Sequence, residues 1–215
     1  MDSLRLHIFL NALEPDSPAL LQKMEEYAAE HHVPIVRPEM AALLRTLVEL
    51  RCPERILEVG CAIGYSALQM ARVMPETAEI LTIEQFAPRI PVAREYFRLA
   101  GEEERITLLE GDAAELLPDL PGTFDFIFMD AAKGQYLQML PEVLRLLAPG
   151  GVLVTDNVLQ EGTLLESRYA VARRDRTIHR RLREYLYQLK HCDELETSIL
   201  PVGDGAAVSV RRHSR

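Results

Sequence analysis

The chain of 215 residues carries 33 acidic and 24 basic side chains, a formal net charge of −9 that argues against nonspecific nucleic-acid binding over the whole surface. Its apolar runs are too short to cross a membrane, and the start Met1–Arg5 lacks the pattern of a secretory signal. Cys52, Cys61 and Cys192 have no metal-site spacing and predict free thiols in a reducing compartment. We therefore expect a cytoplasmic protein with no membrane partner.

The first 52 residues are predicted to be helical, because their apolar side chains recur at helical spacing. The predicted helices span residues 3–13, about 17–32 and about 39–50. We expect residues 1–52 to form a helical cap on a single domain that covers residues 1–215, since a chain of this length makes one sizeable domain.

Beyond residue 52 the pattern alternates between strands and helices. The predicted strands span residues 56–59, 80–84, 106–109, 124–129, 152–155, 194–200 and 206–211. Two of the predicted helices begin near residues 64 and 113, and three others span about 88–100, 136–147 and 166–189. This order predicts an α/β fold with a mostly parallel sheet, whose last strand turns back at Gly203-Asp204-Gly205 and runs antiparallel to its neighbour. Ligands of such sheets bind beyond the carboxyl ends of the strands.

Gly60 and Gly64 lie in the segment that joins the first predicted strand to its helix. Gly60 lets the backbone turn sharply and approach a ligand, and Gly64 opens the helix. Their spacing, G-x-x-x-G, lacks the third glycine of the loop that binds the pyrophosphate of a dinucleotide. The segment therefore favours a cofactor loop over an NAD site, with simple packing of the glycines as the alternative.

Two acidic residues lie at the ends of the next two predicted strands, since Glu84 is the last residue of the second and Asp112 comes shortly after the third. Glu84 could accept both hydroxyls of a ribose, with a solvated strand end as the alternative. Asp112 could contact an adenine amine or cap the following helix. Because the carboxyl ends of adjacent parallel strands meet at one edge, the glycine loop and the two acids together predict a nucleoside pocket.

Asp130 and Asp156 follow the fourth and fifth predicted strands, and Asn157 comes directly after Asp156. A charge at the end of a buried strand needs a partner or a metal. Two carboxylates and an amide oxygen are hard ligands that suit Mg²⁺ or Mn²⁺. We therefore expect a metal site at this edge; the alternative is that each acid caps a loop.

Lys133 lies three residues after Asp130. Near a divalent cation and partly out of water its pKa is expected to fall, so that the amine could act as a base, with a surface lysine or an ion pair as the alternative. A metal that chelates two neighbouring oxygens acidifies a hydroxyl, and the oxyanion can attack the methyl group of a sulfonium. The expected substrate therefore has vicinal oxygens, as in a catechol.

These motifs resemble those of the class I S-adenosylmethionine methyltransferases, and within that class the cation-dependent O-methyltransferases that act on catechol and caffeoyl-CoA. The segments that carry the resemblance are 56–66, 82–84, 111–113, 130–136 and 156–158. The chain is most similar to the bacterial tRNA 5-hydroxyuridine methyltransferases, through 155–159 and 199–205 as well. The resemblance covers nearly the whole chain and implies a Rossmann-like fold with a seven-stranded sheet.

The resemblance also implies a role for each site residue. Asp130, Asp156 and Asn157 would bind Mg²⁺, and the catalytic residues would be Lys133, as the base, and Asp130. The residues implied to contact S-adenosylmethionine are Val36, Ser66, Glu84, Asp112, Ala113 and Asp130, together with Gly60 of the glycine loop. A homodimer is the state implied by the family.

The similar tRNA enzymes make 5-methoxyuridine at the wobble position. Their substrate, 5-hydroxyuridine, carries its hydroxyl beside the O4 carbonyl, so it has the vicinal oxygens expected above. The chain departs from those enzymes at Gln160-Glu161-Gly162, where they tend to have an aromatic residue and an arginine before the glycine. This departure bears on substrate fit, because the segment follows the predicted metal ligands.

Seven arginines and one aspartate lie between Arg168 and Arg183. On a helix, Arg173, Arg176, Arg180 and Arg183 would form one stripe, opposite an apolar stripe. This stripe could contact the phosphates of tRNA. The alternative is a solvated face that pairs with neighbouring acids or with a second subunit.

Three functions remain open at this point. The first is methylation of 5-hydroxyuridine in tRNA, and the second is methylation of a small catechol-like metabolite. The third is non-catalytic binding of a nucleoside or of RNA, against which Lys133 and the complete metal set argue.

Overall fold

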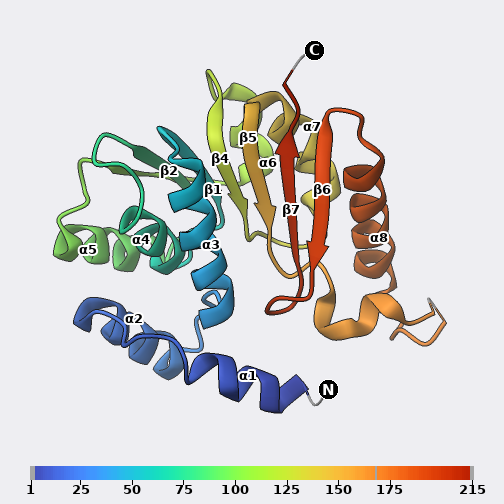
Figure 1. Cartoon of the computed structure of the whole chain (residues 1–215), viewed down its shortest axis with the longest axis horizontal. Helices are drawn as coiled ribbons and strands as arrows, with labels where there is room; N and C mark the ends of the chain where they lie inside the picture. The colour runs from blue at the N-terminus through green and yellow to red at the C-terminus, as the bar shows by residue number, and fades with distance from the viewer. Residues whose placement is uncertain (1–2, 168, 214–215) are drawn as a thin grey trace.

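The computed structural model describes residues 3–167 and 169–213, which form a seven-stranded sheet flanked by helices (Figure 1). The strand order is β3-β2-β1-β4-β5-β7-β6. The strands are β1 (Arg55–Val59), β2 (Glu79–Glu84), β3 (Ile106–Glu110), β4 (Phe124–Met129), β5 (Leu147–Thr155), β6 (Leu195–Leu200) and β7 (Ala206–Arg211). Strands β1 to β5 pair in parallel, and β7 runs antiparallel to both β5 and β6. The predicted fold class is confirmed.

Helices cover both faces of the sheet. They are α1 (Ser3–Asn11), α2 (Ala19–Glu30), α3 (Pro38–Arg51), α4 (Tyr65–Ala71), α5 (Ile90–Ala100), α6 (Ala113–Leu116), α7 (Tyr136–Leu146) and α8 (Arg176–His191). Alternate strand residues point to opposite faces. Ile56 thus joins the core under α2 to α5, and Leu57 joins the core under α6 to α8.

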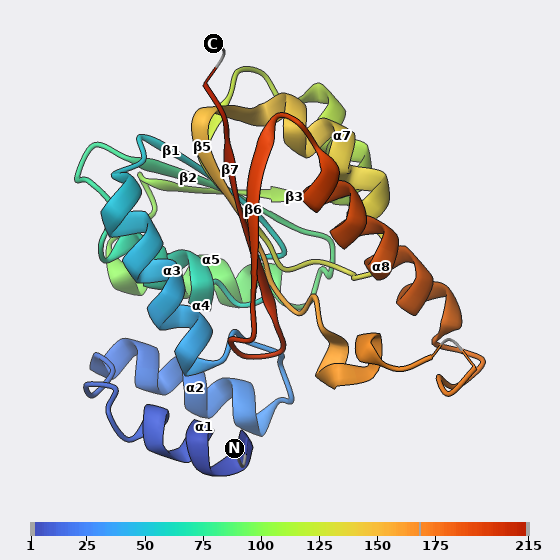
Figure 2. The same ribbon diagram turned by 45° about the vertical axis from the view of Figure 1, so that its right-hand side comes forward.

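The N-terminal helices share the core of the sheet. Met24 of α2 and Met40 and Leu44 of α3 are fully buried in the same cluster as Ile56 and Phe128. Figure 2 shows α1 and α2 near the turn between β6 and β7, at the edge where the parallel strands end. Among the described residues, no helix combines the length and the apolar composition that a bilayer crossing requires.

The prediction of one helix over 166–189 is wrong. Helix α8 begins at Arg176, after a 3₁₀ helix at Gln160–Leu165 and a loop. The loop folds against the start of α8, where Val171 is buried and its carbonyl oxygen accepts a hydrogen bond from Arg176 Nε at 3.1 Å. Tertiary contacts thus override the amphipathic pattern, and Arg173 lies before the helix; Arg168 lies outside the described residues.

Candidate active site

The glycine loop lies directly against the strand that carries Asp130. Gly60 has a φ of +105°, and a Cβ atom there would come within 2.1 Å of the Asp130 carbonyl oxygen. A side chain at this position is therefore excluded by the backbone of Asp130 as well as by the conformation. Gly64, with a φ of +86°, caps the start of α4 as predicted.

Glu84, at the end of β2, holds the glycine loop. Its carboxylate is buried and accepts hydrogen bonds from the backbone N–H groups of Ala62 and Phe86, each at 2.7 Å. Each carboxylate oxygen thus has one donor and keeps room for another. The alternative of a solvated strand end is wrong, because Glu84 is buried, whereas the predicted acceptance of ribose hydroxyls stays compatible with this geometry.

Asp112, at the end of β3, caps α6. Its Oδ1 accepts from the backbone N–H of Ala114 at 2.9 Å, which is the capping role that the sequence left open. Its Oδ2 lies 3.5 Å from Nε2 of Gln135, a residue of the loop after β4. Asp112 therefore connects the third strand to the loop that carries Lys133.

These strand ends enclose a cavity of about 440 Å³. Its walls include five of the predicted cofactor residues, namely Gly60, Glu84, Asp112, Ala113 and Asp130. Val36 instead lines an adjoining cavity of about 230 Å³, together with Asp130, Asp156 and Asn157. Ser66 lies in neither wall, because its side chain is buried against the carboxyl group of Glu58.

Asp130, Asp156 and Asn157 meet at the ends of β4 and β5, as predicted. Nδ2 of Asn157 donates to Oδ1 of Asp130 at 3.1 Å, and its backbone N–H donates to Oδ1 of Asp156 at 2.6 Å. Asn157 has a φ of +60°, a left-handed conformation that asparagine adopts more readily than most residues. The short loop thus places Asn157 between the two carboxylates, with its side-chain amide bonded to Asp130 and its backbone N–H bonded to Asp156.

Burial leaves this pair of carboxylates poorly compensated. Burial raises the pKa of Asp130 to about 6, against hydrogen bonding from Asn157 and the charge of Lys133. Burial, and next the charge of Asp130, raise the pKa of Asp156 to about 7. Two neighbouring acids with raised pKa values, of which Asp156 is buried, are a donor set whose charges a divalent cation would stabilise. Within residues 3–167 and 169–213, no group of three or more His, Cys, Asp or Glu side chains has metal-site geometry, so the candidate site consists of two carboxylates and one amide.

Lys133 has a partner that the sequence did not predict. Its Nζ lies 3.1 Å from Oδ2 of Asp204, in the turn between β6 and β7. The side chain of Lys133 is 30% exposed and that of Asp204 is 6% exposed. The sequence did carry a signal for Asp204. Gly203-Asp204-Gly205 predicts a turn after β6, and β6 runs parallel to β5, so this turn lies at the edge of the sheet where the parallel strands end.

Glu58 is a second acid that the sequence analysis did not single out. It is fully buried on β1, and its Oε2 accepts from the hydroxyl of Thr82 at 2.5 Å, whereas its Oε1 accepts no hydrogen bond from the part of the chain that the structure describes. Burial raises its pKa to about 7, against the opposing effect of the neighbouring Ser66 and Thr82 hydroxyls. The glycine loop therefore lies over a buried carboxyl group.

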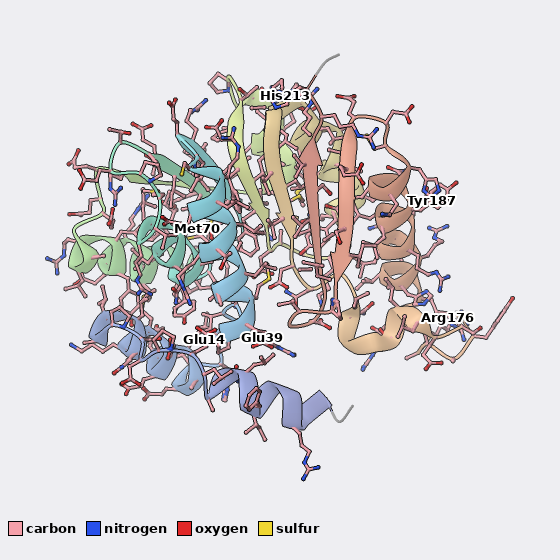
Figure 3. All side chains as sticks on the ribbon, viewed as in Figure 1. Glu14, Glu39, Met70, Arg176, Tyr187 and His213 are labelled. Atoms are coloured by element: carbon pink, nitrogen blue, oxygen red, sulfur yellow. The ribbon has the colours of Figure 1, made fainter. Side chains whose placement is uncertain are left out.

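The predicted arginine stripe is divided by the fold. Nη1 of Arg183 donates to the carbonyl of Leu164 at 3.1 Å, and Arg176 donates to the loop, so both hold the segment before α8. Arg173 and Arg180 are exposed. Figure 3 shows Arg176 near the start of α8 and Tyr187 further along its outer side.

Comparison with known proteins defines the class. The structure superposes on an S-adenosylhomocysteine-bound methyltransferase of Podospora anserina with a TM-score of 0.87, at 26% identity, over 99% of this chain and 97% of that one. The fold and the ligand edge of the sheet are thus those of a Rossmann-like methyltransferase.

The sequence comparisons narrow the class to a family. The family model described as O-methyltransferase matches residues 12–212. A catechol O-methyltransferase of Niastella koreensis is 35% identical over 135 residues, which cover 61% of this chain and 61% of that relative. A caffeoyl-CoA O-methyltransferase of Eucalyptus globulus is 28% identical over 98% of this chain and 89% of its own. This chain belongs to the O-methyltransferase family and is an S-adenosylmethionine-dependent O-methyltransferase.

Proposed function

We propose that the protein is a divalent-cation-dependent O-methyltransferase that methylates one of two vicinal oxygens, and that its substrate is 5-hydroxyuridine in tRNA. The observation that carries the proposal is the position of the neighbouring acids Asp130 and Asp156. The pair adjoins both Lys133 and the cavity that Glu84 and Asp112 line. A cation, a base and a nucleoside cofactor would thus meet at one point of the sheet edge.

The donor set of the metal site supports the first part of this proposal. Asp130, Asp156 and Asn157 would hold Mg²⁺ or Mn²⁺, because both acids have raised pKa values and Asn157 donates one hydrogen bond to each of them. A cation bound there would supply the positive charge that acidifies a substrate hydroxyl. Rotation of the Asn157 amide would turn its oxygen, rather than its nitrogen, toward the cation.

The proposed cofactor residues act by positioning. Glu84 would accept the two ribose hydroxyls with its remaining lone pairs while it keeps the glycine loop in place. Asp112 would face the adenine amine, and the backbone at Gly60 would lie against the cofactor next to Asp130. Val36 would lie on the metal side of the site, and Ser66 would support the loop from below through Glu58.

The chemical step uses the side chain of Lys133. Its amine would accept the proton of the substrate hydroxyl, and the carboxylate of Asp204 at 3.1 Å would stabilise the ammonium that results. S-adenosylmethionine bound in the cavity would supply the methyl group, and S-adenosylhomocysteine would be the leaving group. Lys133 and Asp204 keep the proton away from the attacking oxygen.

Exposed positive charge beside the site supports tRNA as the substrate. Arg173 and Arg180 are exposed near the start of α8, and they could contact phosphates without giving up a structural hydrogen bond. Arg176 and Arg183 would contribute by holding the loop rather than by binding RNA. 5-Hydroxyuridine also carries the vicinal oxygens that the site would need.

A small catechol-like metabolite is the second candidate. It is favoured by the relatives named as catechol and caffeoyl-CoA O-methyltransferases. Both substrates place a hydroxyl beside a second oxygen, so the metal site alone does not separate them.

The two candidates are separated by nucleoside mass spectrometry of total tRNA from cells with and without the gene. We expect 5-methoxyuridine to be lost and 5-hydroxyuridine to accumulate when the gene is deleted. Purified protein with Mg²⁺ and S-adenosylmethionine should then restore the methyl group on that tRNA. Unchanged tRNA together with methylation of free catechol would overturn the tRNA proposal in favour of the second candidate.

A further inference from the structure

Lys133 lies in a turn that is held from three sides. The backbone N–H of Gln135 donates to the carbonyl of Ala132 at 2.8 Å, so that Lys133 and Gly134 are the central residues of the turn. The amine of Lys133 is held by Asp204, and the side chain of Gln135 reaches Asp112. The third contact comes from α8.

Arg181 of α8 makes this third contact. Its Nη1 donates to the carbonyl oxygen of Gly134 at 2.9 Å. A Cβ atom added to Gly134 would lie 3.7 Å from the same nitrogen and 4.0 Å from Cγ1 of Ile178, one helical turn earlier. Gly134 thus packs directly on the face of α8 that Ile178 and Arg181 share.

Helix α8 is itself fixed to the metal side of the sheet. Tyr185 is fully buried, and its hydroxyl lies 2.6 Å from the hydroxyl of Thr155, the residue before Asp156. The ring of Tyr185 also lies 5.5 Å from that of Tyr136, whose hydroxyl donates to the carbonyl of Asp156 at 3.2 Å. Helix α8 is therefore held next to the proposed metal ligands, so a hydrogen bond from Arg181 can hold the turn in a fixed position relative to them.

We infer that Arg181 is a positioning residue for the methyl transfer. It fixes the carbonyl of Gly134, and through it the turn that aims the amine of Lys133 at the metal side of the site. The inference rests on the proposed role of Lys133 as the base. Arg181 of α8 would thus contribute to methyl transfer through its hydrogen bond to the turn, without contacting the reacting atoms.

The neighbouring Arg180 offers a matched control. Both arginines are exposed on α8, and they carry the same charge on consecutive residues. Replacing either with glutamine removes one positive charge, so a loss of phosphate attraction alone would affect both variants. Only the Arg181→Gln change removes the hydrogen bond to Gly134, and Arg181→Lys keeps a charged donor at this position.

The first measurement is hydrogen exchange of the Gln135 amide, which reports on the turn without any substrate. We expect exchange to be about tenfold faster in Arg181→Gln and unchanged in Arg180→Gln. The second measurement is the kinetics of methyl transfer with Mg²⁺, on whichever of undermodified tRNA and free catechol the wild-type protein methylates. We expect kcat to fall about tenfold in Arg181→Gln with an unchanged KM for S-adenosylmethionine, a shifted pH profile and partial rescue in Arg181→Lys.

Equal exchange rates in Arg181→Gln and Arg180→Gln would overturn the inference, whatever the substrate proves to be. An Arg181→Gln variant with faster exchange but wild-type kcat and pH profile would also overturn it, since the contact would then be only structural. The proposed role of Lys133 has its own test in Lys133→Met. If that variant keeps its activity, the base assignment fails; if it is inactive and Arg181→Gln equals Arg180→Gln, only the inference fails.

Discussion

On the cofactor side of the sheet edge, Glu84 accepts backbone N–H groups from Ala62 and Phe86, and Asp112 accepts one from Ala114. On the metal side, Asp130 and Asp156 lie within the same fold but are buried with fewer donors, and their pKa values rise to about 6 and about 7. The first pair is compensated by the chain itself. The second pair is compensated only partly, as expected if the proposed cation completes the compensation of its charges.

The largest effect is expected from the metal side. Asp156→Ala should reduce methyl transfer by roughly a thousandfold or more, because a ligand and a negative charge are lost where the cation would act. Affinity for S-adenosylmethionine should stay within about twofold, since Asp156 does not line the larger cavity. Steady-state kinetics and calorimetry measure the two quantities, with the exposed Asp193→Ala as the control. Retained turnover in Asp156→Ala would remove the metal mechanism.

A smaller effect is expected from the cofactor side. Glu84→Gln should weaken S-adenosylmethionine binding by about ten- to a hundredfold, because one charged acceptor for ribose and for the loop is lost. Calorimetry measures the affinity. Glu110→Gln is the matched control, since Glu110 pairs with Glu84 in register but is exposed and bound to Arg94. Equal affinities for the two variants would argue against Glu84 as the ribose acceptor.

The raised pKa values should also make the stability of the metal-free protein depend on pH. Asp156 has a pKa of about 7 in the folded protein, against 3.8 for an unperturbed aspartate, which stands for the unfolded state. Between these two pH values the folded protein therefore keeps a proton that the unfolded protein has lost. The stability of the metal-free protein should therefore fall as pH rises from about 4 to 7. Glu58 contributes in the same direction, with a pKa of about 7.

Thermal unfolding tests this sign. We expect the metal-free Tm to drop by a few degrees, roughly 2–4 °C for each kcal/mol lost, between pH 5 and pH 8. Asp156→Asn should flatten part of this slope, and added Mg²⁺ should raise the Tm more at pH 8 than at pH 5. A metal-free Tm that rises across this range would contradict the assignment of raised pKa values to the site.

The smallest effect on the chemistry is expected at the basic surface. Changing Arg173 and Arg180 together to Glu should weaken tRNA binding by roughly tenfold at moderate salt and leave methylation of a free nucleoside unchanged. Filter binding measures the affinity for tRNA, and steady-state kinetics measures methylation of the free nucleoside. The same changes at Arg176 and Arg183 should instead lower stability, because those side chains hold the loop before α8. Equal losses for tRNA and nucleoside would mean that Arg173 and Arg180 are structural.

The sequence predicted what depends on strand order. Glu84, Asp112, Asp130 and Asp156 each follow a strand, and parallel strands bring their carboxyl ends to one edge. For that reason the fold class and the meeting of these acids could be foreseen. The glycine at position 60 could be foreseen as well, although its contact with the Asp130 carbonyl could not.

The remaining features depend on contacts between distant segments. Asp204 reaches Lys133 only because β6 and β7 return beside β5, and Arg181 reaches Gly134 only because α8 packs on the loop after β4. The helix predicted from residue 166 begins at Arg176 because buried Val171 folds the chain back. Periodicity along the chain carries no information about such partners.

The central claim is that Asp130 and Asp156 bind a divalent cation, and calorimetric titration of the metal-free protein with Mn²⁺ tests it most directly. We expect one site per chain in the wild-type protein at pH 8, weaker binding at pH 5, and no binding in Asp156→Ala. Wild-type binding of Mn²⁺ by the Asp156→Ala variant, or no binding by the wild-type protein with S-adenosylmethionine present, would contradict it.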